Sequence, residues 1–579
     1  MKKSLFITVP ALALISLQTS AQVMPPNIIP QLITIRKQDL DSIKRLQQEK
    51  EKMRDYDNRQ AVIEQITKEL LKKREELFER TKAPEIKIKS AYVETIEVSG
   101  NGILTPEEID DIVKDYEKTD LTFSALKELI GRLDELCVEK GYITSFAYIP
   151  EQKVNRGLLK IAIREGKIGK IRIDGNRWTK ETHILSRLDM REGEVFNMKT
   201  LANNIMNYNH YNDGVTLKAD LNPGEKENTT DIDITAEERA PYHFIGIADN
   251  SGRDAVGRNR AGLIAGHDSL FGLRDKLSAG IYANRHSKTP FIDYNIPVNK
   301  YDGSVGVSLS YNEAEVGHGP LENMDIVTRT RSHSVYYTHP FIHRLHDELS
   351  GKISYTYKRS VTSAGKMNLH RDKIPELKGD INYRRDTRGG VWYFAQSLSY
   401  AAPWYQKNID YFKFNGSVTR LQDFGYRIFG SFRGVYQYIP KNKVPIIDQM
   451  AVGGVGTVRG YSPGVMVVAK SGYQLNAEIY FPIGPEEFNI GDETYRTDKY
   501  LRPFVFTDYA SLYPYRGDVS HYNDVLFSAG AGLRLQLPYN IVLKATYGIP
   551  VKHNKYDNHH GDWNLEISVS PDFNKFFAE

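Results

Sequence analysis

The period of the hydrophobic positions changes once along the chain, close to residue 240. Before this point, apolar residues recur every three or four positions in stretches that alternate with short strand-like runs. After it, short segments alternate between apolar and polar residues and are separated by turns. A period near 3.6 is typical of amphipathic helices, and a period of two is typical of strands. The pattern therefore predicts an α+β part followed by an all-β part.

The α+β part contains the same order of elements twice, at a period of about 75 residues. Each copy reads strand, helix, helix, strand, strand. In the first copy, residues 88–165, Thr105 and Pro106 mark the start of a helix, and the second helix stops at Gly141. Residues 166–239 form the second copy, so we expect two copies of one small domain. The predicted elements are Tyr92 to Val98, Ser124 to Lys140, Ile143 to Ile149 and Leu158 to Arg164 in the first copy, and Ile168 to Ile173, Thr182 to Leu188, Met198 to Asn209, Thr216 to Asn222 and Thr230 to Glu237 in the second.

Residues 240–579 read as a series of about sixteen strands, an even number as bacterial barrels require. Every odd position of Val525 to Leu537 is apolar, and the even positions from Gln474 to Tyr480 form a mostly polar face that includes Glu478. A soluble sandwich would alternate in the same way. Strands of about ten residues are longer than usual, and they favour a transmembrane antiparallel β-barrel.

The residues ahead of the repeats predict an exported chain. In residues 1–21, Lys2 and Lys3 precede an apolar run that ends in small residues, which is the layout of a signal peptide. Residues 22–87 predict an amphipathic helix and a linker, because about residues 38–82 lack Gly and Pro and carry apolar residues at helical spacing. This pattern fits both a plain linker and a plug that occupies the pore.

Composition agrees with a barrel. The 579 residues include 36 Tyr, 23 Phe and only 4 Trp, which suits barrel strands with aromatic girdles. No run of about 18 apolar residues follows the N-terminus, so we expect no helical membrane span. The formal net charge of +4 gives no argument for nucleic acid. The single cysteine, Cys137, lies at helical spacing from Leu129, Leu133 and Leu136, so we expect a buried core thiol.

Patterns that would indicate an enzyme are missing from the sequence. His559 and His560 lie in a polar turn with no third ligand at metal spacing. The glycine-rich segments lack the Lys-Ser/Thr of a phosphate loop, and no nucleophile elbow is present. We therefore expect no catalytic residue, no metal and no cofactor.

The connection between the predicted eleventh and twelfth strands contains GGVGTVRGY, Gly453 to Tyr461. Glycines on both sides of Arg459 allow the loop to fold tightly and to approach other backbone closely. A guanidinium inside a barrel requires a carboxylate, preferably a bidentate one. Glu478, on the inward face of the following strand, is one candidate. Alternatively, Arg459 is an extracellular loop cation in water.

The motif Val458, Arg459, Gly460 and Tyr461 resembles the VRGY/F loop of outer-membrane transporters with POTRA domains. The whole chain is most similar to the ShlB/FhaC/HecB family, the translocators of two-partner secretion (type Vb). GYITSFAYIPEQKVNRGLLKIAIREGKI, from Gly141 to Ile168, is similar to the first POTRA domain of that family, and LKADLNPGEKENTTDIDITAEE, from Leu217 to Glu238, is similar to the end of its second. The resemblance also implies an Asp partner for Arg459 in an F-x-D segment, which here is Phe506-Thr507-Asp508.

The resemblance implies an outer-membrane barrel with POTRA domains in the periplasm, which secretes a partner protein such as a haemolysin or an adhesin. The partner would be received unfolded, and outer-membrane lipid, lipopolysaccharide and the barrel assembly machinery would be further partners. An assembly factor similar to BamA or TamA is the alternative, although that class usually has more than two POTRA domains. A passive porin would leave the POTRA domains unexplained. The tail after Phe573 departs from the family pattern.

Overall fold

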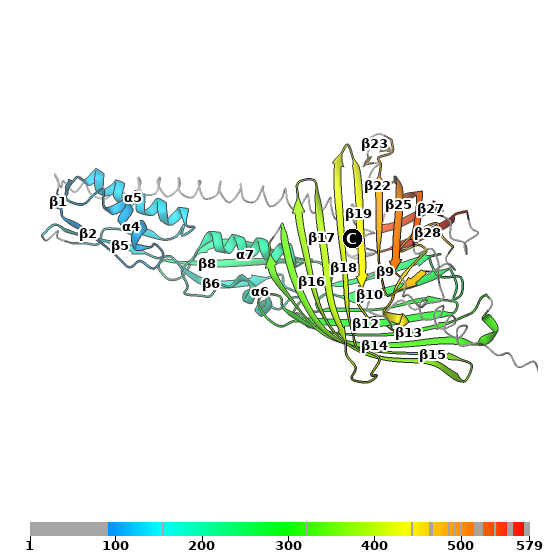
Figure 1. Cartoon of the computed structure of the whole chain (residues 1–579). Helices are drawn as coiled ribbons and strands as arrows, with labels where there is room; N and C mark the ends of the chain where they lie inside the picture. Colours follow the sequence, from blue (N-terminus) through cyan, green and yellow to red (C-terminus); the bar gives the residue numbers. More distant parts are fainter. Residues whose placement is uncertain are drawn as a thin grey trace, which may run out of the picture. The chain divides into compact units, whose positions relative to one another are not determined.

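The computed structural model describes residues 91–571, with gaps. The gaps are residues 153–155, 213, 320, 345, 442–443, 463–466, 485–486, 491–492, 497–500, 514–524, 538–539 and 553–559. The segments 1–21 and 22–87, His559 and the tail from Phe573 onward lie outside the described residues. These residues divide into two compact units, which meet in sequence at Arg239 and Ala240 (Figure 1). Within them, no helix combines the length and the apolar character needed to cross a membrane.

The first repeat has a three-stranded sheet, a two-stranded sheet and two helices. Its elements are β1 (Ala91–Val93), β2 (Thr95–Ser99), α4 (Pro106–Val113), β3 (Thr119–Leu121), α5 (Phe123–Glu139), β4 (Phe146–Tyr148) and β5 (Leu158–Arg164). The Thr105 side chain accepts a hydrogen bond from the Glu108 backbone, and the Glu108 side chain accepts one from the Thr105 backbone. This capping box explains the start of α4. Cys137 is buried in the core, as predicted.

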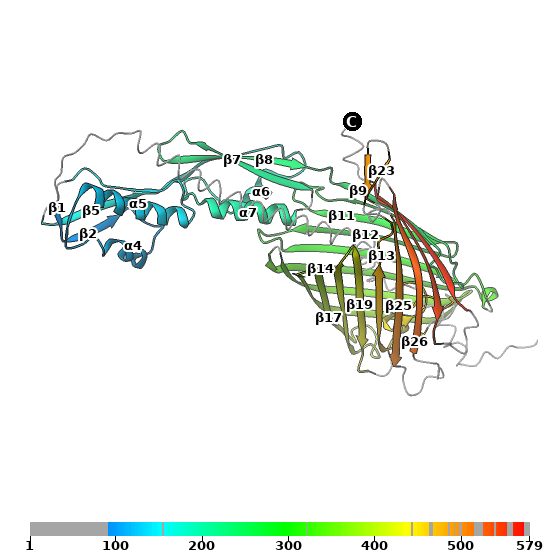
Figure 2. The same cartoon turned by 90° about the horizontal axis from the view of Figure 1, so that it is seen from above.

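The second repeat has the same three-stranded sheet topology and also two helices. Its elements are β6 (Lys167–Asp174), α6 (Glu181–Leu188), α7 (Met198–Tyr211), β7 (Val215–Pro223) and β8 (Thr229–Glu238). The sheet order is β6-β8-β7 here and β2-β5-β4 in the first repeat, with one parallel and one antiparallel pair in each. Figure 2 shows α6 and α7 alongside β7 and β8. The repeat in the sequence therefore corresponds to a repeat in the structure.

One predicted strand, Tyr92 to Val98, is wrong, because the structure breaks it at Glu94. β1 pairs with β3, whereas β2 pairs with β5, so the two halves belong to different sheets. The backbone amides of Glu94 and Thr95 both donate to the carbonyl of Gly157, at 2.7 and 3.2 Å. The turn that contains Gly157 thus takes the backbone bonds that a continuous strand would have used.

The two repeats are bonded to each other where α5 ends and α7 begins. The Asn197 side chain donates to the carbonyl of Lys140 at 3.0 Å, and the Met198 amide donates to the carbonyl of Gly141 at 2.9 Å. The Lys199 ammonium donates to the carbonyl of Glu139. The last carbonyls of a helix lack partners within it, so these bonds satisfy groups that α5 leaves open.

The second unit is a closed antiparallel barrel, in which the described residues form sixteen strands. Each strand pairs with the next, and β28 pairs with β9 to close the sheet. The strands are β9 (Tyr242–Asp249), β10 (Arg260–His267), β11 (Lys276–Asn284), β12 (Ser287–Pro297), β13 (Ser304–Glu315), β14 (Ile326–His343), β15 (Asp347–Ala364), β16 (Met367–Thr387), β17 (Gly390–Ala401), β18 (Tyr411–Gly425), β19 (Ile428–Tyr438), β22 (Ser471–Tyr480), β25 (Leu501–Tyr513), β26 (Val525–Leu537), β27 (Ile541–Pro550) and β28 (Asp562–Val569). The predicted fold class and strand number are confirmed.

Two connections of the barrel carry a small hairpin. β20 (Met450–Val452) pairs with β21 (Val467–Ala469) between β19 and β22, and β23 (Glu487–Ile490) pairs with β24 (Glu493–Arg496) between β22 and β25. A short 3-10 segment, Ile446–Asp448, precedes β20. The connection between β19 and β22, residues 439–470, is called the long loop below.

The faces of the barrel are those of a membrane protein. Ile353, Val335 and Leu263 are each more than half exposed, whereas Thr330 and Thr356 are buried. A soluble sandwich would bury its apolar face, but here the apolar side chains of the strands point away from the interior. This arrangement resolves the ambiguity of the alternating pattern in favour of a transmembrane barrel.

Candidate functional site

The long loop places the motif Val458 to Tyr461 against the inside of the barrel wall. Gly460 has a φ of +88°, a left-handed conformation that favours glycine. A Cβ atom at this position would lie 2.6 Å from the carbonyl carbon of Gly548 on β27. The backbone of the loop can therefore approach the backbone of β27 only because both residues are glycine.

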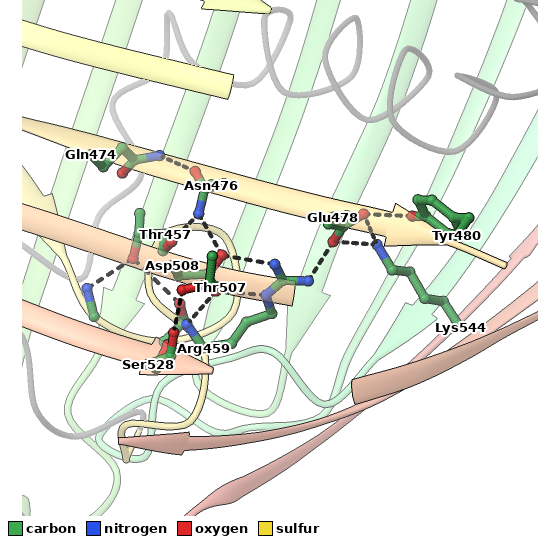
Figure 3. A network of polar contacts seen from close by, with 12 residues as sticks. Thr457, Arg459, Gln474, Asn476, Glu478, Tyr480, Thr507, Asp508, Ser528 and Lys544 are labelled. Atoms are coloured by element: carbon green, nitrogen blue, oxygen red, sulfur yellow. Dashed lines mark hydrogen bonds and ion pairs between the residues drawn. The ribbon is translucent and has the colours of Figure 1, made fainter. Parts of the chain in front are cut away.

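Arg459 forms the centre of a polar network (Figure 3). Its Nε donates to Asp508 Oδ2 and its Nη2 donates to Asp508 Oδ1, both at 2.7 Å, and its backbone amide donates to Oδ2 at 3.0 Å. Its Nη1 forms an ion pair with Glu478, and its Cζ lies 3.6 Å from the centre of the Phe506 ring. The guanidinium thus has a bidentate carboxylate, a second carboxylate and an aromatic face, which are the contacts that distinguish Arg from Lys.

The carboxylates of this network are themselves held. Asn476 donates from Nδ2 to Asp508 Oδ1 at 2.9 Å and to the carbonyl of Thr457 at 2.6 Å. Lys544 Nζ on β27 lies 3.1 Å from Glu478 Oε1. The four charged groups are two cations and two carboxylates, so the network is neutral. We call Arg459, Asp508, Glu478 and Lys544 the first ionic cluster.

The side chains of Val458 and Tyr461 pack against apolar residues of the wall. Val458 and Tyr461 are both fully buried, and they pack in a cluster with Ala510, Leu512 and Leu526 of β25 and β26. The Tyr461 hydroxyl also accepts a hydrogen bond from the Phe527 amide at 2.9 Å and donates to the carbonyl of Lys552. All four residues of the motif therefore contact the barrel wall.

The structure brings Arg459, Phe506, Asp508 and Glu478 together from the long loop, β25 and β22. The sequence offered Asp508 and Glu478 as alternatives, but both bind the same guanidinium. The Arg459 side chain is 11% exposed, so it does not lie in open water. The pairing of Lys544 with Glu478 was not predicted from the sequence, because two strands separate the two residues in the barrel.

Sequence reasoning also missed a second ionic cluster, which binds the start of the long loop. Asp448 lies 3.1 Å from Lys358 Nζ on β15 and 3.2 Å from Lys413 Nζ on β18, and Tyr411 donates to it. Glu376 on β16 pairs with the same lysines, at 2.6 and 3.4 Å. We call Lys358, Glu376, Lys413 and Asp448 the second ionic cluster. Its four side chains are at most 9% exposed, and its charges also balance.

The chemistry of these clusters is that of anchors. Buried, balanced ion pairs hold a segment in one place, because breaking one partner leaves an uncompensated charge. The long loop is bound to β15 and β18 at Asp448 and to β22 and β25 at Arg459, which are different parts of the wall. Among the described residues, no group of three His, Cys, Asp or Glu side chains is arranged to hold a metal ion.

Comparison with known families matches nearly all of the described chain. Residues 228–535 match the family described as haemolysin secretion/activation protein ShlB/FhaC/HecB. Residues 92–166 match the POTRA domain of the ShlB type, and residues 167–239 match the POTRA domain described as a surface antigen variable number repeat.

Individual relatives agree with this assignment. The chain is 21% identical to the heme/hemopexin transporter protein HuxB of Haemophilus influenzae (strain 86-028NP), over 81% of this chain and 85% of HuxB. Among solved structures, CdiB from Escherichia coli has a TM-score of 0.61 at 19% identity, covering 88% of this chain and 98% of that one. BamA from Haemophilus ducreyi, lacking POTRA domains 1–3, has a TM-score of 0.54 at 13% identity, covering 83% and 100%. These structural likenesses show the fold.

The family match therefore decides between transporters that share this fold. It spans more than half of the 579 residues and continues into the two POTRA matches. The chain belongs to the ShlB/FhaC/HecB family, the outer-membrane β-barrel transporters with periplasmic POTRA domains that secrete exoproteins by two-partner secretion.

Proposed function

We propose that the POTRA pair captures an unfolded partner protein in the periplasm, and that the barrel passes it outward while the long loop controls the pathway. The observation that carries this proposal is the anchoring of the long loop at Arg459 within a barrel that follows two POTRA domains. Relatives are named as transporters of heme/hemopexin and of hemolysin. We infer a large exoprotein of this general class as the cargo.

The edge strand β7 is the candidate capture site. It lies at the edge of the sheet β6-β8-β7 and is nine residues long, whereas the edge strand β4 has three residues. An unfolded segment can add to such an edge through main-chain hydrogen bonds. The Asn209 side chain accepts a hydrogen bond from the Leu217 amide and donates one to the Leu217 carbonyl. The outward backbone groups of Leu217 are therefore already paired. Backbone groups of alternate residues point outward, so Ala219 and Leu221 offer the next outward positions.

A proline at this edge tests the capture step. Ala219→Pro removes one outward amide without removing a bond to β8, so the POTRA domain should still fold. We expect secretion and binding of an unfolded partner segment to fall, as measured by export assays and by pull-down. Ala219→Val, which keeps the amide, is the matched control. Normal secretion by the proline variant would place capture elsewhere.

A deletion tests the role of the whole POTRA pair. Removing residues 88–238 should leave a barrel that is still heat-modifiable on gels, because its strand pairing is internal. Secretion and partner binding should be lost. If outer-membrane protein assembly fails instead while export continues, the chain acts as an assembly factor similar to BamA.

We further propose the domain limits that the sequence suggests: a signal peptide at 1–21, a helix and linker at 22–87, POTRA domains at 88–165 and 166–239, and the barrel at 240–579. If the helical segment occupies the pore, deleting residues 38–70 should raise single-channel conductance in planar bilayers. Unchanged conductance would support the linker interpretation. The transporter family is typically non-enzymatic, and we propose no catalytic activity for this chain.

A further inference from the structure

Three basic side chains stand in one row across neighbouring strands on the outer face of the barrel. Arg331 on β14 is directly opposite Arg359 on β15, which is directly opposite Lys373 on β16. Adjacent strands are about 4.8 Å apart, so the three positions lie within about 10 Å. Their neighbours in sequence, Ser332 and Ser360, are buried in the interior, so these basic residues face outward. We call Arg331, Arg359 and Lys373 the basic row.

The basic row lacks compensating charge. Among the described residues, no carboxylate forms an ion pair with Arg331, Arg359 or Lys373. Arg329, two positions along β14, differs because it pairs with Glu313 at 2.8 Å. Like charges that are directly opposite each other on paired strands are destabilising. The row therefore favours an anion from outside the protein.

The row lies at the end of the barrel that faces the outer leaflet. β15 is the seventh strand of the antiparallel barrel, so it runs in the same direction as β9, which follows the second POTRA domain after three residues of the chain. Since the POTRA domains are periplasmic, the C-terminal end of β15, where Arg359 lies, is the extracellular end. Tyr355 and Tyr357 are the two outward residues that precede Arg359 on this strand. The ring of Tyr355 lies 5.9 Å from the ring of Trp404.

An aromatic belt lies directly below the basic row. Tyr357, the next outward residue toward the periplasm, has its ring 5.3 Å from the ring of Tyr405. Trp404 and Tyr405 are both more than half exposed, and the outward residues Ile353 and Leu377 continue the apolar band toward the periplasm. Aromatic girdles mark the level of the lipid headgroups in outer-membrane barrels. The basic row thus stands at the height of the phosphates of the outer leaflet.

We propose that the basic row binds the phosphate groups of lipopolysaccharide in the outer leaflet. Guanidinium groups bind phosphate with directed, paired hydrogen bonds, and a lysine adds a further cationic donor. The site is on the lipid-facing surface, so it is separate from the secretion pathway. A bound phosphate would offset the repulsion between the like charges that β14, β15 and β16 carry in this row.

The test uses the full chain, purified in detergent, with lipopolysaccharide of defined structure. Wild type, the triple variant Arg331→Gln/Arg359→Gln/Lys373→Gln and a control triple variant are titrated with bis-phosphorylated lipopolysaccharide and with its dephosphorylated form. The control, Lys276→Gln/Lys300→Gln/Arg388→Gln, removes three exposed basic residues at the periplasmic end. Each basic residue near an anionic surface contributes roughly a factor of five, so the row variant should bind about a hundredfold more weakly.

The expected pattern is specific in three respects. The control should bind like the wild type, the dephosphorylated form should bind weakly to all variants, and the difference between the variants should shrink as salt is raised. Vesicles of phosphatidylglycerol and inorganic phosphate are tested in parallel, and neither should match the lipopolysaccharide. Equal binding by the row variant and the wild type, equal loss in the control, or equal binding of the dephosphorylated form would each overturn the proposal.

Discussion

Lys544 on β27 and Glu478 on β22 are joined at 3.1 Å, although β25 and β26 lie between their strands in the barrel. This pair crosses the inner surface of the wall and also completes the charge balance around Arg459. The loop motif is therefore anchored to several strands. Replacing a charged residue on one of these strands changes the charge balance around Arg459.

The first prediction concerns Arg459. Arg459→Ala leaves Asp508 and Glu478 with Lys544 as the remaining cation, and breaking one partner of a buried pair typically costs about 3–5 kcal/mol. We expect a large loss of secretion while the barrel still assembles, because strand pairing is untouched. Arg459→Lys should recover little, because an ammonium cannot reproduce the bidentate contact. Secretion assays with heat-modifiability on gels measure both effects.

The control for this variant is Arg329→Ala. Arg329 pairs with Glu313 on an exposed surface, where ion pairs are worth about 0–1 kcal/mol. The Arg329→Ala variant should secrete nearly normally. If Arg459→Ala also secretes normally, Arg459 is not required as an anchor.

The second prediction is a double-mutant cycle between Arg459 and Asp508. Asp508→Ala should impair secretion, because Asp508 accepts from the Arg459 side chain and backbone and from Asn476. The double alanine variant leaves Glu478 and Lys544 as a balanced pair, so its loss should be smaller than the two single losses added together. Additive losses would show that the two residues act independently, and the pairing with Glu478 would then be the next contact to test.

The third prediction uses two glycines of the same loop. Gly460→Ala should loosen the loop and reduce secretion several-fold, because its Cβ would collide with the backbone of Gly548 and its φ is positive. Gly456→Ala is the matched control, because a Cβ at Gly456 meets nothing within 4 Å. Both barrels should fold. Equal secretion by the two variants would mean that the close approach at Gly460 is unimportant.

The fourth prediction concerns the second ionic cluster. Asp448→Asn leaves Lys358 and Lys413 facing Glu376 alone, and this unbalanced charge should release the start of the long loop. We expect a higher single-channel conductance in planar bilayers and a lower temperature of unfolding on gels. Combining it with Lys413→Met restores neutrality, so the double variant should recover much of the stability. A double variant that is worse than Asp448→Asn would contradict this account.

The sequence predicted those parts of the fold that depend on local periodicity. β26, Val525–Leu537, has the predicted limits, because the alternation of its side chains persists to both ends. The start of α4 was predicted from Thr105 and Pro106, since capping depends on neighbouring residues. β3, Thr119–Leu121, was not predicted, because its three residues form a strand only through pairing with β1.

The candidate site shows the same division. Arg459 belongs to a motif of the family, and the family pattern implies Asp508, in an F-x-D segment of a later strand, as its partner. The second ionic cluster has no motif, because its four members come from three strands and a 3-10 segment that are up to 90 residues apart. The available signal was a lysine among inward hydroxyl groups on β15, where Lys358 lies between Thr356 and Ser360. Only the closed barrel shows which carboxylates face it.

The bonds between Asn197, Met198, Lys199 and the end of α5 limit the degrees of freedom of the periplasmic arm. Because the two repeats are bonded to each other, each repeat restricts how the other can turn. A segment bound by one repeat would therefore be held at a high effective concentration near the edge strand of the other, without any input of chemical energy.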